Sequence, residues 1–162
     1  MTRIETRVLD ALAAMRKVAL AVAPIALRLA LATPFFRSGM TRWDGWFSLS
    51  STTTYLFETE FKLHLFGHQV GFPWPDAVAY LVALLEIGLP VLLVLGLGTR
   101  FVALALLVMT GVIELVVPDG WANYHIHWAA EAIAIIALGA GPLSLDRALQ
   151  AWRAPRRGRA RA

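Results

Sequence analysis

The chain of 162 residues contains no cysteine. This absence excludes disulfide bonds, thiol relays, thiolate metal sites and iron–sulfur ligation. Charged residues are also scarce, at 16% of the chain, while 58% of the residues are hydrophobic and the mean hydropathy is +0.62. Such a composition is too apolar for a soluble domain of this length and indicates a membrane protein. Any redox chemistry must therefore use a bound cofactor or a partner protein.

The net charge of +4 does not indicate nucleic-acid binding. The basic residues are concentrated towards both ends of the chain, where they flank hydrophobic segments, as expected for signals of membrane topology. Four lysines and arginines precede residue 18 and six follow residue 142. Because positively charged segments are retained in the cytoplasm, this bias predicts that both termini are cytoplasmic.

Four apolar stretches approach the ~20 residues that a helix needs to cross ~30 Å of hydrocarbon. They are separated by proline- and glycine-rich turns, and they cover residues 18–36, 74–97, 101–117 and 122–140. We therefore predict an all-α fold, a four-helix transmembrane bundle over residues 18–142. A cleavable signal peptide is the alternative for the first stretch, but Arg28 in its middle and the bulky Phe35 and Phe36 at its end argue against cleavage.

Three segments outside the spans complete the predicted organisation. Residues 1–17 combine basic side chains with apolar ones at helical spacing, which predicts an amphipathic cytoplasmic lead-in on the membrane surface. Residues 37–73 mix aromatic and charged side chains in a pattern that favours a helix lying in the outer interface. Residues 143–162 form a basic cytoplasmic tail.

Four ionisable residues interrupt the apolar stretches: Arg28, Glu86, Glu114 and Glu131. A charged group inside a membrane helix costs about 2.5–3.5 kcal/mol on insertion scales, so each is a candidate functional residue. Arg28, Glu86 and Glu131 lie near the midpoints of their spans and are predicted to converge at similar depth. One interpretation is a salt bridge from Arg28 to one glutamate, with another glutamate holding a proton beside a quinone. The alternative is an ion pair that only fixes the packing of the helices.

A second set of polar residues falls on the predicted outer side. It contains the four histidines and one aspartate, and its members are His64, His68, His125, His127 and Asp119. If the connecting segment is helical, Glu60, His64 and His68 form one stripe that can bind copper or zinc. No spacing matches a defined metal signature, so local hydrogen bonding at the interface is the competing interpretation.

Three sequence segments together resemble the DoxX family. They are the run from Arg28 to Arg42, the segment Gly71-Phe72-Pro73 with Leu84-Leu85-Glu86-Ile87-Gly88, and the glycine-rich turn Leu95-Gly96-Leu97-Gly98-Thr99-Arg100. The first contains an early arginine, a phenylalanine-containing turn, a glycine and then a basic residue, as in the first helix of that family. The resemblance covers residues 25–142 and implies a four-helix inner-membrane protein. Members of that family are associated with quinone-linked sulfur oxidation and with oxidative-stress complexes.

From these features we expect a membrane subunit of a redox or metal-stress system with a pocket for a quinone or another small ligand. The expected partners are the lipid bilayer and a membrane or soluble protein, and a homo-oligomer is compatible with the sequence. The chain is expected to be an accessory subunit; if it is catalytic, quinone-linked oxidoreduction is the expected reaction. Two other functions remain open: metal handling through the outer histidines, and a scaffold that docks a soluble partner.

Overall fold

The computed structural model describes residues 3–153, and its regular structure is predominantly helical. The long helices are α1 (Arg3–Met40), α3 (Pro75–Leu95), α4 (Thr99–Val116) and α5 (Ile126–Leu138), followed by the short α6 (Leu145–Arg153). Two turns precede α5: the 3₁₀ helix η2 (Pro118–Gly120) and the π-helical turn η3 (Trp121–His125). The predicted tail beyond Arg153 lies outside the described residues.

Three helices, α1, α3 and α4, are long and apolar enough to cross a membrane. The 13 residues of α5 rise only roughly 20 Å, short of the ~30 Å hydrocarbon thickness. The four predicted spans therefore correspond to three helices of full length and one shorter helix preceded by η3. The fourth crossing remains a prediction, because the first residues of the predicted span, 122–125, belong to the π-helical turn η3 and α5 begins only at Ile126.

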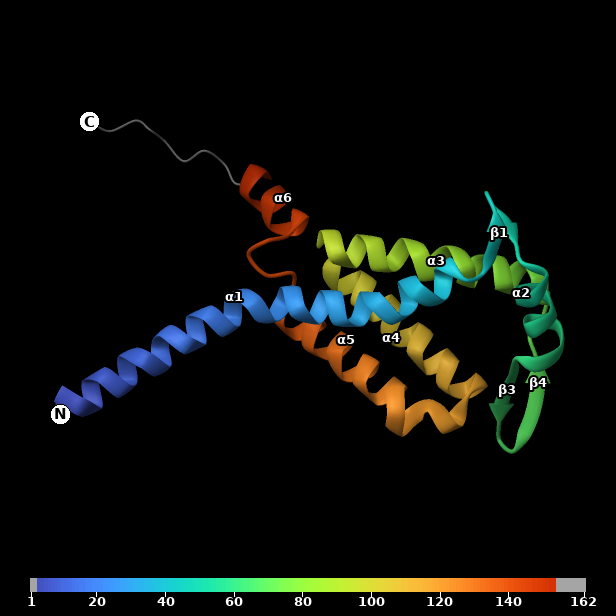
Figure 1. Ribbon diagram of the computed structural model, residues 1–162, viewed down its shortest axis with the longest axis horizontal. Coiled ribbons are helices and arrows are strands. Elements are labelled where there is room, and N and C mark those ends of the chain that lie inside the picture. Colours follow the sequence, from blue (N-terminus) through green and yellow to red (C-terminus); the bar gives the residue numbers. More distant parts are fainter. Residues whose placement is uncertain (1–2, 154–162) are drawn as a thin grey trace.

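The helix α1 differs from the predicted division into a surface lead-in and a separate span. It runs without interruption through 38 residues, and its N-terminal part projects beyond the other helices (Figure 1). No turn sequence separates residue 17 from residue 18, and Pro24 and Pro34 are both accommodated inside the helix. Residues 3–17 are exposed and continue the axis of the first span instead of starting a separate element.

The segment between α1 and α3 is helical only in its middle, at residues 51–60, and its two hairpins make the fold mixed rather than purely helical. It contains the hairpin of β1 (Trp43–Gly45) and β2 (Ser48–Leu49), the short helix α2 (Ser51–Tyr55), the π-helical turn η1 (Leu56–Glu60), and the hairpin of β3 (Lys62–Leu65) and β4 (His68–Gly71). Left-handed backbone at Phe66 and Gly67 reverses the chain between β3 and β4.

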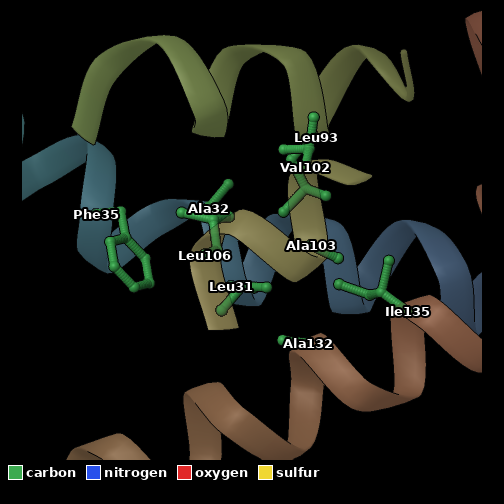
Figure 2. Packing of buried hydrophobic residues seen from close by; sticks show 9 residues of the cluster. All are labelled: Leu31, Ala32, Phe35, Leu93, Val102, Ala103, Leu106, Ala132 and Ile135. Carbon is green, nitrogen blue, oxygen red and sulfur yellow. The ribbon is translucent and has the colours of Figure 1, made fainter. Parts of the chain in front are cut away.

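One core joins the four long helices. Its buried residues come from all of them, and Figure 2 shows them pointing into the space between the ribbons: Leu31, Ala32, Phe35, Leu93, Val102, Ala103, Leu106, Ala132 and Ile135. Ala32, Ala103 and Ala132 are nearly inaccessible, and their small side chains let the helix backbones approach closely. Outward-facing leucines and valines on α3 and α4 are exposed, as expected for helices that meet lipid.

The bundle has two ends that the later sections treat separately (Figure 1). The hairpin end consists of residues 41–74 and 117–125. The α6 end consists of residues 96–98 and 139–153, and the projecting part of α1 lies on the same side.

Candidate functional site

A bidentate ion pair between α3 and the chain just after α1 forms the centre of the site. Glu86 is buried, with 2% of its side chain exposed, and Arg42 is 14% exposed. The Arg42 Nε donates to Glu86 Oε2 at 2.5 Å, and Nη2 donates to Glu86 Oε1 at 2.7 Å. Parallel hydrogen bonds of this kind fix the guanidinium plane as well as its charge. Glu86 is therefore charge-compensated by Arg42.

Two features of the local sequence bring these side chains together. Gly39 packs on α3 so closely that a Cβ atom there would lie 2.9 Å from the backbone carbon of Glu86. Arg42 follows Gly39 by three residues, and its carbonyl oxygen accepts hydrogen bonds from the Ser50 amide at 2.9 Å and the Thr53 hydroxyl at 3.2 Å. The close helix contact and the first turn of α2 thus hold the Arg42 backbone beside Glu86.

The ion pair borders a mostly apolar pocket of about 190 Å³, which lies between the four long helices and the segment that connects α1 to α3. Five aromatic side chains line it: Phe35, Phe57, Phe61, Phe72 and Trp128. The Phe57 ring lies 5.1 Å from Phe61 and 5.9 Å from Phe72 between centroids, and the Arg42 guanidinium sits 5.4 Å from the Phe57 centroid. The pocket therefore combines aromatic walls with one polar wall formed by the ion pair.

The guanidinium of Arg42 retains hydrogen-bonding capacity. An arginine has five N–H donors. Nε and Nη2 are directed at Glu86, and Nη2 also lies 3.5 Å from the Ser38 hydroxyl. Within residues 3–153, no acceptor is found for Nη1. Two donors thus remain available on a pocket-lining group.

The structure does not bring Arg28 to Glu86, contrary to the predicted convergence. Arg28 precedes Arg42 by 14 residues, or roughly 21 Å along a helix. Its guanidinium donates to backbone carbonyl oxygens at the α6 end: Pro24 at 3.3 Å, Val94 at 3.3 Å and Leu143 at 2.7 Å. Arg28 therefore joins the end of α3 to the chain leading into α6, a structural role.

Asp146 on α6 extends this structural contact. Its two carboxylate oxygens accept hydrogen bonds from the amides of Gly98 at 2.7 Å and Thr99 at 2.9 Å, at the start of α4. Burial by itself raises the pKa of Asp146, but the backbone hydrogen bonds from Thr99 and Gly98 and the charge of Arg28 outweigh it, so the pKa lies below the usual value. An ionised Asp146 therefore caps α4 from a different helix.

The two remaining predicted glutamates occupy different environments. Glu114 accepts a hydrogen bond from Nδ1 of the buried His125 at 2.6 Å, and the His125 ring packs on Gly120, which has no side chain to obstruct it. Glu131 is half-buried on α5, and its Oε2 atom is buried without a hydrogen-bond partner among the described residues. Neither glutamate is bonded to the Arg42–Glu86 pair.

The predicted metal residues are not gathered into one site. His64 in β3 donates to the Leu115 carbonyl and accepts from Gln69, both at 3.1 Å, and His68 is exposed in β4. The hairpin replaces the helix on which the stripe of Glu60, His64 and His68 depended. His127 and Asp119 are exposed. Across residues 3–153, no group of three or more histidine, aspartate or glutamate side chains is placed to hold a metal ion.

Arg42 is the candidate site residue that the sequence analysis did not single out. It lies outside the apolar spans, where a basic residue was interpreted only as a topology signal. The available signal was the glycine followed by a basic residue, Gly39 and Arg42, in the segment that resembles DoxX. The Arg42 amide donates to the Gly39 carbonyl oxygen at 3.2 Å, so this spacing places Arg42 in the turn that ends α1.

Residues 23–119 match the DoxX family model, which covers more than half of the chain. No curated protein and no solved structure matches the chain. The matched range includes the Arg28 contacts on α3, the Arg42–Glu86 pair and most of the pocket. The chain is a membrane protein that belongs to the DoxX family.

Proposed function

We propose that the chain binds a small planar ring with an acceptor oxygen, such as a quinone headgroup, in the pocket beside Arg42 and Glu86. The observation that carries this proposal is a half-buried arginine, charge-compensated by the buried Glu86, with two unused donors on the wall of an aromatic pocket. The Arg42–Glu86 pair has no net charge, which favours a neutral ligand over an anion. Nη1 is the group that would donate to the carbonyl oxygen of the ring.

The size of the pocket supports a single ring. A cavity of about 150 Å³ lined by apolar side chains is known to accept benzene, and this pocket measures about 190 Å³. The Phe57 and Trp128 rings offer surfaces on which an aromatic or quinoid ring can stack. A bound quinone would supply two-electron redox chemistry that the protein side chains do not provide, consistent with a subunit that acts beside other redox proteins.

Quinone binding can be measured directly with the purified, detergent-solubilised chain. Trp128 lines the pocket, so a short-chain benzoquinone is expected to quench tryptophan fluorescence saturably. Val112→Phe should fill the pocket and weaken binding by at least about fivefold, since overpacking costs about 1–3 kcal/mol. Val108→Phe, one turn earlier on the exposed side of α4, is the matched control and should bind normally.

The outcomes of this experiment are distinct. Saturable quenching that is lost only in Val112→Phe supports the proposal. Quenching that is linear in quinone concentration, or equal in both variants, would show that the ligand partitions into the detergent and not into the pocket. Circular dichroism of each variant verifies that the helices are retained.

A further inference from the structure

A second, polar cavity lies at the α6 end and plays no part in the proposed function. It measures about 490 Å³ and lies between the start of α4, the end of α5 and the helix α6. Its walls are mainly polar, in contrast to the pocket beside Arg42. The charged groups that line it are Arg100, Arg147 and Asp146, and Gln150 adds an amide.

The charges of this cavity are unbalanced. Asp146 is occupied by the Gly98 and Thr99 amides, so its oxygens are already used within the protein. Arg100 is exposed, with its guanidinium beside Gly139, where a Cβ atom would lie 3.6 Å from Nη2. Neither Arg100 nor Arg147 forms a salt bridge to any carboxylate of residues 3–153. Two cations therefore face the cavity without a protein partner.

Apolar surface borders this cationic cavity. Leu138 at the end of α5 lines it and is 48% exposed. On α6, Leu145, Leu149 and Trp152 share one side of the helix and are exposed, with Trp152 at 82%. Arg147 and Gln150 occupy the other side, which lines the cavity. Tryptophan is typical of the boundary between lipid headgroups and acyl chains.

We propose that this cavity binds the headgroup of an anionic phospholipid, with its phosphate between Arg100 and Arg147. Guanidinium groups bind phosphate oxygens through charge-assisted hydrogen bonds, and the Gln150 amide is placed to bind a headgroup hydroxyl. The acyl chains leave the cavity past Leu138, and the apolar side of α6, which faces away from the cavity, suits the membrane interface. A lipid fits better than a soluble anion because the membrane-spanning helices place the cavity at the bilayer surface and the exposed Leu138 borders it.

The test uses the full chain purified in detergent, with lipid binding followed by native mass spectrometry. Phosphatidylglycerol should remain bound where phosphatidylcholine, at the same concentration, does not. Arg100→Gln and Arg147→Gln should each weaken phosphatidylglycerol binding about fivefold, as expected for the loss of one basic residue at an anionic membrane surface. Arg153→Gln removes the same charge from the same helix outside the cavity and should bind normally.

Three results would overturn the proposal. Equal retention of both lipids would remove the preference for an anionic headgroup. An equal loss of phosphatidylglycerol binding in Arg153→Gln would show that binding depends on general surface charge and not on the cavity. Competition by inorganic phosphate or glycerol phosphate at micromolar concentration would assign the site to a soluble anion.

A second measurement avoids dependence on the arginine variants. Because the chain has no cysteine, Ala151→Cys introduces a unique attachment point for a fluorophore one helical turn beyond Arg147, beside the cavity and outside its lining. In nanodiscs, brominated phosphatidylglycerol should quench this fluorophore more strongly than brominated phosphatidylcholine at equal content. A fluorophore attached through Arg153→Cys should be quenched equally by both lipids, and equal quenching at position 151 would contradict the proposal.

Discussion

The two arginines at opposite ends of the packed part of α1 contrast in how their hydrogen-bond donors are used. Arg28 donates to three backbone carbonyl oxygens and holds the α6 end together. Arg42 donates to one buried carboxylate and keeps two donors free beside a pocket. A buried cation alone therefore does not identify a functional site. The unused donors and the adjacent space distinguish Arg42.

The largest expected effect is a loss of stability on removal of Arg28. In Arg28→Leu, the carbonyl oxygens of Val94 and Leu143 lose a charged donor, and hydrogen bonds of charged groups contribute about 1.5–3 kcal/mol each. We expect the thermal midpoint in detergent to fall markedly, while the folded fraction still binds quinone. The exposed Arg37 on the same helix provides the control Arg37→Leu, and an equal change in both variants would remove the structural role of Arg28.

An intermediate effect is expected at Gly39, where α1 meets α3. A Cβ atom in Gly39→Ala would clash with the Glu86 backbone and with Ile87, and overpacking of this kind costs about 1–3 kcal/mol. We expect lower stability together with weaker quinone binding, because a shift of α1 away from α3 would also displace Arg42, which follows α1 directly. Gly88→Ala on α3 meets nothing within 4 Å and should be neutral or slightly stabilising. Unchanged melting and binding in Gly39→Ala would contradict the close contact.

The smallest expected effect is at Asp146 and depends on pH. Because the pKa of Asp146 is lowered in the folded protein, its stabilising contribution is present above the unfolded pKa and disappears as the pH falls through the folded pKa. At pH 7, Asp146→Asn replaces one acceptor oxygen with an NH2 group, so the amide of Gly98 or Thr99 loses its partner and we expect a loss of about 1 kcal/mol. The difference in melting temperature between this variant and the natural chain should shrink as the pH falls below about 4, the usual pKa of an aspartate, because the lowered pKa of Asp146 lies beneath that value. A difference that stays constant below that pH would exclude an ionised cap.

Glu86 was predictable from the sequence and Arg42 was not, for a physical reason. A lone carboxylate within an apolar run can be recognised from the sequence alone, because burying a carboxylate without a partner is costly. The identity of its partner depends on which helices are in contact. Gly39 has no side chain and lets α1 pack closely on α3 beside Glu86, which brings Arg42 to the carboxylate. Arg28 looked equivalent because its hydrogen bonds to backbone carbonyl oxygens leave no trace in the sequence.

The same distinction explains the connecting segment. Its apolar and charged residues match a helical period between 55 and 66, which is why a helix was expected there. The structure is helical only up to Glu60. From Lys62 it forms β3 and β4 on either side of Phe66 and Gly67, and β3 packs against α4 through the hydrogen bond from His64 to Leu115. The tertiary contact overrides the local pattern. The positions of α3 and α4, which depend only on long apolar runs, were predicted to within two residues.

The most direct test is the dissociation constant of a short-chain benzoquinone for Arg42→Gln and Arg37→Gln, measured beside the natural chain. Both variants remove one charge from the same region, but only Arg42 lines the pocket beside Glu86. Loss of a charged hydrogen-bond donor, about 1.5–3 kcal/mol, corresponds to at least about tenfold weaker binding. We expect that loss in Arg42→Gln and none in Arg37→Gln. Quinone binding by folded Arg42→Gln with the affinity of the natural chain would contradict the central role of Arg42.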